Sequence, residues 1–236
     1  MILKGGHTVV DWHCHILPRM DDGSESPEES LQMLHALGAD GITAVVATPH
    51  FYAHEDTVEG FLERREAALA ALSPHVDASC PRILLGAEVA YYPGIARLRE
   101  LSRLTVEGTS LLLLEMPMAR WTEITVCELC ELSAVRGLSV VLAHVERCLA
   151  YQSGGTLRRL LQAGIGMQVN ASCLLRPGRR RMLRLLRAGA VRYVGSDAHN
   201  MTSRAPMIGE AYRVIEKKLG KPFLERLCEM GEHPLG

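Results

Sequence analysis

Short apolar runs alternate with longer amphipathic stretches along the whole chain, and this alternation restricts the fold more than any other feature. The runs have the length and the leucine and β-branched content of buried strands. They cover His7–Asp11, Gly41–Ala47, Arg82–Ala87, Ser110–Leu114, Leu138–Ala143, Gly166–Val169 and Val191–Gly195. The stretches with helical spacing are Pro27–Leu37, Thr57–Leu72, Glu123–Val135, Thr156–Gln162, Arg179–Arg187 and Pro206–Lys218. Because strands joined by helical crossovers pair in parallel, the order predicts an α/β fold with a parallel sheet.

Signals at the helix ends agree with this order. Ser26 can cap the first helix, Pro27 suits its first turn, and Glu29 completes an S-x-x-E capping box. Glycine follows several helical stretches, where a left-handed residue is needed before the next strand. These glycines are Gly41, Gly137, Gly164 and Gly189. We therefore expect each helix to end sharply and to return to the sheet.

The length of the chain suits a closed arrangement of these units. No linker rich in Pro, Gly or Ser divides the 236 residues, so we expect a single domain over residues 1–236. Seven β-α units in about 200–250 residues is the size of a TIM-like barrel. A doubly wound open sheet of similar length is the alternative.

Composition excludes several classes of protein. The chain has 26 Lys and Arg against 27 Asp and Glu, which gives a net charge of −1 and argues against nucleic-acid capture as its main role. No apolar run reaches about 18 residues, so we expect no membrane insertion. The N-terminus lacks the apolar region of a secretory signal, and the seven cysteines have no framework spacing. Together these features predict a cytoplasmic protein with free thiols.

Ionisable side chains follow almost every predicted strand. In a β/α barrel the C-terminal strand ends converge on one face, so these side chains would share one bowl. They are His13, His15, His50, Glu88, Glu115, His144, Asp197 and His199. A single histidine of this kind is more often a hydrogen-bonded core residue, whereas the full set favours metal binding.

The spacing within this set also favours metal ions. Side chains alternate with period two in an extended chain, so His13 and His15 point to the same side, as do Asp197 and His199. Imidazole together with carboxylate suits Mn, Fe or Zn.

The other histidines lie in helical patterns, helix-flanking segments or near the termini, and we interpret them as structural or exposed: His7, His35, His54, His75 and His233.

Two arginines accompany the predicted ligands. Arg147 lies three residues after His144, and Arg204 lies five residues after His199. Because a guanidinium fork matches phosphate oxygens, arginines at the rim of a metal site indicate a phosphoester substrate. A surface salt bridge is the alternative interpretation for each of them.

Several motifs resemble the polymerase and histidinol phosphatase (PHP) superfamily, in order and at the family's spacing from residue 11 to about residue 204. They resemble most closely the CpsB-type protein-tyrosine phosphatases of bacterial capsule biosynthesis. The motifs are DWHCH (11–15), DDG (21–23), ATPH (47–50), GAE (86–88), LLLEMP (112–117), AHVER (143–147), VNAS (169–172) and SDAHN (196–200).

The resemblance implies a distorted seven-stranded β/α barrel with three divalent metal ions, Mn or else Fe or Zn, that activate water to hydrolyse a phosphomonoester. Matched to the family, the first ion takes His13, His15, Glu88 and Asp197, the second shares Glu88 and adds Glu115 and His144, and the third takes Asp22, His50 and His199. Asp22 is chosen over Asp21 because it matches the second Asp of the family's D-D-G. Arg147 and Arg204 match the arginines that orient phosphate.

The resemblance also implies a substrate. It favours phosphotyrosine in a protein, such as the tail of a membrane-associated capsule or exopolysaccharide tyrosine kinase. A small-molecule phosphatase such as histidinol-phosphatase is the alternative within the same chemistry. A PHP-type nuclease is a lesser alternative, because the net charge is close to zero. A metal-binding protein without activity is also disfavoured, because the complete ligand set and both arginines are present.

A cysteine-dependent phosphatase is a separate hypothesis. The pattern C-x5-R occurs at Cys130–Arg136, inside a helical stretch, and at Cys173–Arg179, between a strand and a helix. The second context suits phosphate binding by backbone N–H groups. However, Pro177 removes one donor, Leu174 and Leu175 are bulky, and no His precedes the cysteine. We therefore favour the metal-dependent mechanism.

The stretch Arg176–Arg187 contains six arginines and no acid. It could dock an acidic partner, an anionic membrane surface or a nucleic acid. We favour the solvated face of a helix whose apolar side chains point inward: Met182, Leu183, Leu185 and Leu186.

Overall fold

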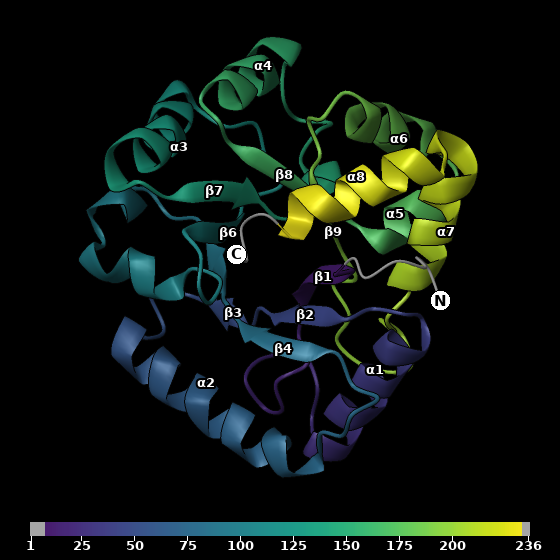
Figure 1. Cartoon of the computed structure of the whole chain (residues 1–236). Coiled ribbons are helices and arrows are strands. Elements are labelled where there is room, and N and C mark those ends of the chain that lie inside the picture. Colours follow the sequence, from purple (N-terminus) through teal and green to yellow (C-terminus); the bar gives the residue numbers. More distant parts are fainter. Residues whose placement is uncertain (1–7, 233–236) are drawn as a thin grey trace.

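The computed structural model describes residues 8–232, in which parallel strands form a curled central layer and the α-helices surround it (Figure 1). Every pairing between strands in this range is parallel. One sheet has the order β1-β2-β4 and the other β3-β5-β6-β7-β8-β9. The strands are β1 (Val10–Cys14), β2 (Ala44–Ala47), β3 (His50–Phe51), β4 (Arg82–Leu85), β5 (Glu88–Ala90), β6 (Leu111–Glu115), β7 (Ser139–Leu142), β8 (Gly166–Asn170) and β9 (Tyr193–Gly195).

Eight α-helices lie between residues 8 and 232. They are α1 (Pro27–Ala39), α2 (Val58–Leu72), α3 (Glu123–Arg136), α4 (Gly154–Gln162), α5 (Ala171–Leu175), α6 (Arg180–Arg187), α7 (Ile208–Leu219) and α8 (Lys221–Glu232). Short 3₁₀ turns are η1 (Ser73–His75), η2 (Ile95–Arg97), η3 (Arg99–Leu104) and η4 (Val145–Arg147). Six of the α-helices lie where the amphipathic stretches predicted them, within a few residues at each end, whereas α5 and α8 were not predicted. None of the helices between residues 8 and 232 combines the length and apolarity needed to cross a membrane.

The count of seven strands is not confirmed, because residues 8–232 contain nine strands. Two predicted strands are each followed by a second short one, β3 after β2 and β5 after β4. Pro49 lacks the N–H that a continuous ladder needs between β2 and β3. Hydrogen bonds nevertheless continue across both breaks, from Gly86 N to the Ala47 oxygen (2.9 Å) and from Glu88 N to the Pro49 oxygen (3.0 Å).

The sheet curls far enough to bring its first and last strands together. Asp197 N donates to the His13 oxygen (2.8 Å), and His15 N donates to the Ala198 oxygen (2.9 Å). Helices lie around the outside of this curled layer and not on both faces of an open sheet (Figure 1). The first strand also starts later than predicted, at Val10, so His13 lies within β1 and not after it.

The core has an inner and an outer part. Alternate strand residues such as Val10, Trp12, Val46 and Leu113 pack together as one buried cluster. Residues of the opposite parity pack with the helices in two larger clusters. Cys14 has the parity of Val10 and Trp12 but belongs to the outer core, because the register of β1 shifts between Asp11 and Cys14. It therefore faces away from its neighbours His13 and His15. The interior below the strand ends is therefore filled, and only the end itself is left for polar side chains.

The predicted helix-end signals are largely confirmed. Ser26 Oγ accepts from Glu29 N (3.3 Å), although the Glu29 carboxylate accepts from Glu25 N (3.0 Å) and not from Ser26 N. The four glycines after helical stretches adopt positive φ angles. These angles are 86° at Gly41, 63° at Gly137, 80° at Gly164 and 71° at Gly189.

Candidate metal centre

The side chains predicted to bind metal gather at the C-terminal ends of the strands. His13 and His15 come from β1 and the residues after it, His50 and Glu88 open β3 and β5, and Glu115 ends β6. His144 follows β7, and Asp197 and His199 follow β9. Contacts between these side chains link all of them into one network, which we call the bowl.

The carboxylate of Glu88 is the centre of the bowl and is buried. Its Oε2 lies 3.1 Å from His13 Nε2 and 3.3 Å from His15 Nε2. The same oxygen lies 3.2 Å from His50 Nδ1, and Oε1 lies 2.7 Å from His144 Nε2. Burial by itself would raise the pKa of Glu88, but His13, His144 and His15 hold it well below its ordinary value. One anionic group therefore contacts four imidazoles.

The first group of predicted ligands comes together as the resemblance implies. His13, His15 and Glu88 place ligand atoms within 4.8 Å of one another. Asp197 Oδ1 lies 3.6 Å from Nε2 of both histidines. Burial would raise the pKa of Asp197, but His13 and His15 lower it to about 2. Its carboxylate is thus available as an anionic ligand.

The second group is also brought together. His144 Nε2 lies 3.4 Å from Glu115 Oε1 and 2.7 Å from Glu88 Oε1. His50 Nδ1 approaches Glu115 Oε2 at 4.0 Å, and His50, Glu88 and Glu115 form a compact group of their own. Burial would lower the pKa of His144, but Glu115 and Glu88 raise it to about 9.

The third group contains Asp22, His50 and His199, joined by His15. Asp22 Oδ1 lies 3.2 Å from His199 Nε2 and 3.6 Å from His50 Nε2. Burial lowers the pKa of His199 to about 4, with the positive charges of His15 and Arg204 acting in the same direction. Asp22 is the exposed member of the set, so this group lies at the open rim of the bowl.

Asp21 has a different role from its neighbour Asp22. Its Oδ2 accepts from His15 Nδ1 (2.7 Å) and from His50 N (2.8 Å), and its Oδ1 accepts from Gly23 N (2.9 Å). Burial lowers the pKa of His15, but the contacts with Asp21 and Glu88 raise it to about 10. A carboxylate on Nδ1 fixes the ring so that Nε2 faces the bowl. Asp21 was not predicted as a ligand, and this positioning role was not predicted from the sequence.

Gln168 and Asn170 of β8 also support the bowl and were missed. Gln168 Oε1 accepts from His144 N (2.6 Å) and lies 3.3 Å from His13 Nδ1. Asn170 Nδ2 donates to Asp197 Oδ2 (2.6 Å). Both are buried polar residues two positions apart in a strand of otherwise apolar or small residues. That alternation was the signal that could have identified them.

The donor atoms of the bowl fit divalent cations. His13 Nε2 and His15 Nε2 face each other at 3.0 Å. In neutral rings at this distance at most one of the two nitrogens carries a proton, so the other has a lone pair that can bind a cation. Among the described residues, His50 Nδ1, His144 Nδ1 and His199 Nε2 are buried without a properly aligned hydrogen-bond partner. Converging imidazole nitrogens and carboxylates are a ligand set for Mn, Fe or Zn, and binding a cation would release protons from them.

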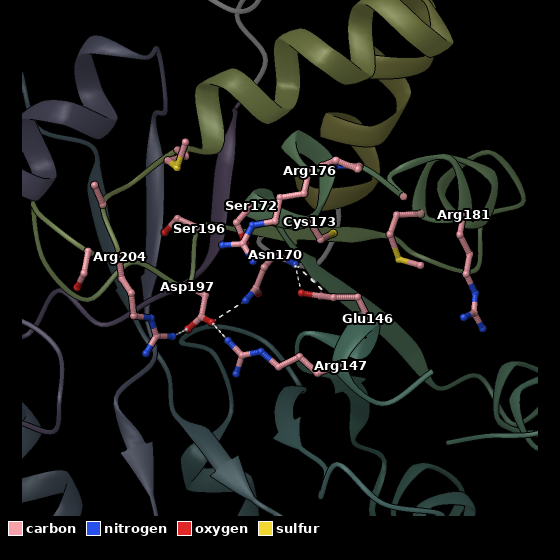
Figure 2. Close-up of a pocket in the computed structure, with 16 residues that line it drawn as sticks. Glu146, Arg147, Asn170, Ser172, Cys173, Arg176, Arg181, Ser196, Asp197 and Arg204 are labelled. Carbon is pink, nitrogen blue, oxygen red and sulfur yellow. Dashed lines mark hydrogen bonds and ion pairs between the residues drawn. The ribbon is translucent and has the colours of Figure 1, made fainter. Parts of the chain in front are cut away.

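Arg147 and Arg204 lie at the rim and both bind Asp197 (Figure 2). Arg147 Nη2 lies 2.5 Å from Oδ2, and Arg204 Nη2 lies 2.7 Å from Oδ1. The expectation of arginines beside the predicted ligands therefore agrees with the geometry, and their partner is a buried carboxylate of the bowl. Arg204 is held by a loop in which Asn200 Oδ1 accepts from the backbone N of residues 202, 203 and 204.

Two features of the backbone bring the bowl together. His144 and Asp197 have positive φ angles of 29° and 54°, which turn the chain sharply after β7 and β9. Gly23 and Gly195 allow close approach to the histidine pair. A Cβ at Gly23 would lie 2.4 Å from the His15 oxygen, and one at Gly195 would lie 2.4 Å from His13 Cβ. Only glycine fits at these two positions without a shift of the backbone.

The cysteine alternative does not have a suitable site. Cys173 lies inside α5, so the backbone of residues 171–175 is helical and does not form a phosphate-binding loop. Burial, together with the charge of Glu146, raises the pKa of the Cys173 thiol, which keeps it protonated. Cys130 lies within α3, as predicted.

The remaining described histidines lie outside the bowl. His35 pairs with Asp77 (3.0 Å), and His54 lies 3.2 Å from Glu55. His75 is exposed in η1. His7 and His233 lie outside the described residues.

Comparison with known proteins supports the interpretation of the site. Residues 9–232 match the model of the family described as capsular polysaccharide synthesis, CpsB/CapC. The chain is 30% identical to tyrosine-protein phosphatase YwqE of Bacillus subtilis over 238 residues, which cover 95% of this chain and 90% of YwqE. It is 29% identical over 229 residues to tyrosine-protein phosphatase CpsB of Streptococcus pneumoniae, covering 90% of this chain and 91% of the relative.

The fold comparison agrees. A crystal structure from work on YwqE of Bacillus subtilis and CpsB of Streptococcus pneumoniae, described there as unique metal-dependent tyrosine phosphatases, superposes with a TM-score of 0.80 at 27% identity. The superposition covers 96% of this chain and 94% of the other. The sequence match and the superposition both run through the strands and loops that form the bowl, and the chain belongs to the CpsB/CapC family.

Proposed function

We propose that this chain is a metal-dependent phosphatase that hydrolyses phosphotyrosine in a protein, and that residues 1–236 form one phosphatase domain. The observation that carries the proposal is the meeting of four imidazoles on the Glu88 carboxylate, with two arginines at the rim. Similarity to relatives named tyrosine-protein phosphatases supports the choice of substrate.

Three divalent cations would occupy the bowl, and we propose Mn²⁺, with Fe or Zn as alternatives. The first would be held by His13, His15, Glu88 and Asp197, the second by Glu88, Glu115 and His144, and the third by Asp22, His50 and His199. When bound, such cations neutralise phosphate oxygens and lower the pKa of water toward 7, so that water can act as the nucleophile.

The side chains of the chain itself orient the reacting groups. Arg147 and Arg204 each have further N–H donors besides those on Asp197, and Arg204 Nη1 lies 3.7 Å from Asp22 Oδ2 at the rim. These donors could bind the oxygens of an entering phosphate. Asp21 keeps the Nδ1 proton of His15, so that Nε2 stays directed into the bowl. Because the phenolate of tyrosine is a stable leaving group, it needs little protonation and no separate general acid.

The family description points to capsular polysaccharide synthesis, and this supports a phosphorylated capsule tyrosine kinase as the protein substrate. We propose that the chain acts in the cytoplasm on the tail of such a kinase at the membrane. All seven cysteines are free, as is usual in a reducing compartment.

The test is hydrolysis by protein stripped with a chelator, before and after Mn²⁺ is added. Substrates are a phosphotyrosine peptide and, beside it, histidinol phosphate. We expect activity on the peptide to disappear with the metal and to return with Mn²⁺. Preference for histidinol phosphate would overturn the proposed substrate, and activity that does not depend on metal would overturn the mechanism.

A further inference from the structure

A polar pocket lies between the rim of the bowl and the start of α6 (Figure 2). It has a volume of about 490 Å³. Arg147, Asp197 and Arg204 form its wall toward the bowl, and Asn170, Ser172 and Arg176 lie along β8, α5 and the turn that follows. A group in this pocket would therefore sit beside a phosphate held at the rim.

The pocket has an excess of positive charge. Four arginines line it, Arg147, Arg176, Arg181 and Arg204, against the carboxylates of Glu146 and Asp197. Asp197 is already bound by two of the arginines. Glu146 accepts from Asn170 N at 3.3 Å and 3.4 Å. Both anions of the pocket are thus occupied by partners other than Arg176.

Arg176 is the arginine of this pocket that is free to bind a ligand. Within residues 8–232 its guanidinium has no ion pair and no hydrogen bond, and the hydroxyl of Ser172 has no hydrogen bond either. Figure 2 shows the Arg176 guanidinium turned toward Ser172 and Asn170, inside the pocket. Arg181 instead points away, and its Nη2 donates to the Leu149 oxygen at 3.3 Å.

The rest of the arginine-rich stretch has an ordinary structural role. Helix α6 buries Met182, Leu183 and Leu186, as predicted, and exposes Arg184 and Arg187 to solvent. Neither of these two arginines lines the pocket. The stretch therefore contains a solvated helix face, Arg181 bound to the Leu149 oxygen, and Arg176, which is unpaired in the pocket within the described part of the chain.

We propose that this pocket is a subsite for a second anionic group of the substrate chain, bound by Arg176, and that it makes the enzyme prefer phosphotyrosine with an acidic neighbour. A planar guanidinium fork suits either a carboxylate or a second phosphate. The inference rests on the proposed function, because the subsite is defined as the place beside a phosphotyrosine that is bound in the bowl.

The experiment uses the Mn²⁺-loaded protein and three peptides of one length, each with a central phosphotyrosine. The neighbours are neutral in the first peptide, glutamates in the second, and one further phosphotyrosine in the third. We measure kcat and KM, following release of the central phosphate by mass, for wild type, Arg176→Gln, Arg176→Lys and Arg187→Gln. The last variant is the control, because Arg187 is an exposed arginine at the far end of α6.

We expect wild type to have a KM roughly fivefold to twentyfold lower for one or both anionic peptides than for the neutral peptide. The preferred peptide identifies whether a carboxylate or a phosphate is bound. Arg176→Gln should bring the ratio close to one, Arg176→Lys should restore part of it, and Arg187→Gln should keep the wild-type ratio. The preference should weaken as salt is added.

Three results would overturn the inference. One is equal KM for all peptides in wild type, and another is an unchanged preference in Arg176→Gln. The third is an equal loss in Arg187→Gln, which would indicate general surface charge. Failure of the proposed function is distinct, because wild type would then hydrolyse neither the peptides nor p-nitrophenyl phosphate with metal, and the inference would fall with it.

Discussion

Asp197 of the bowl and the segment around Cys173 line the same pocket, and both regions match patterns that occur in phosphatases, yet they differ in how their reactive groups are arranged. In the bowl, polar groups from six strands face one another at 2.7–4.0 Å. Cys173, by contrast, belongs to one short helix, and burial raises the pKa of its thiol. The difference teaches that convergence of separate elements, more than a local motif, makes a reactive site.

The largest effect is expected when a predicted ligand is removed, and this tests whether the bowl is the reactive site. We expect His15→Ala and His199→Ala to lower turnover of a phosphotyrosine peptide by about a thousandfold or more, because metal activation of water is lost. Turnover and bound metal per chain should be measured together, with circular dichroism to show that the fold is kept. If either folded variant keeps activity within tenfold of wild type, the metal centre is not the reactive site.

A smaller effect is expected at the rim. Arg204→Ala removes a fork that binds Asp197 and that we propose binds the entering phosphate, so KM should rise by roughly tenfold to a hundredfold. Steady-state kinetics with p-nitrophenyl phosphate measure this, since that substrate has no second anionic group. Arg192→Ala provides a control, because Arg192 is exposed just before β9, at the end opposite the bowl, and its side chain donates to the Gly189 oxygen. Unchanged KM in Arg204→Ala would remove this arginine from the phosphate site.

Asp21→Asn tests the support beneath the ligands. The amide has roughly the same size but is a weaker acceptor for His15 Nδ1, so His15 Nε2 is held less firmly toward the bowl. We expect the Mn²⁺ concentration for half-maximal activity to rise by about tenfold. A merely structural role would lower the melting temperature without changing this concentration, and that result would contradict the positioning role.

The smallest effect is expected at Cys173. Because burial raises the pKa of its thiol, the group is protonated at pH 8 and becomes a thiolate only at much higher pH. Cys173→Ser should therefore change kcat/KM by less than about twofold, and iodoacetamide at pH 8 should leave activity intact. Loss of activity on Cys173→Ser in a protein with full metal content would indicate that Cys173, and not the bowl, is the reactive site.

Much of the fold could be predicted from periodicity and helix-end residues. The glycines at residues 41, 137, 164 and 189 mark helix ends because their φ angles are positive. The interruption of two strands could not be predicted from apolar runs alone, since it depends on Pro49 and on the curl of the sheet. Helix α8 was missed because Gly220 and Pro222 resemble a turn, while Leu224 and Leu227 reach the core only after the chain folds back.

The candidate site, like the fold, has features that could be predicted from the sequence and features that could not. The gathering of the side chains of the bowl could be predicted because strand ends meet at one face, and the motif resemblance selected Asp22 over Asp21 as the proposed ligand. The supporting contacts of Asp21, Gln168 and Asn170 could not be predicted. Gln168 and Asn170 bind partners 24 and 27 residues away, and the contact of Asp21 with His15 depends on the path of the loop between β1 and α1. Arg176 was predicted only as part of a basic stretch, since its direction depends on the turn between α5 and α6.

Gly23 and Gly195 change how inactive variants of this protein should be interpreted. Each touches the backbone of a histidine in the bowl, so any larger residue displaces that histidine although it adds and removes no ligand. In a deep mutational scan scored by activity, these two positions would be as intolerant as the ligands themselves. Loss of activity on substitution therefore does not distinguish residues that shape the backbone from residues that bind metal. Metal content per folded molecule is the measurement that separates the two kinds of residue.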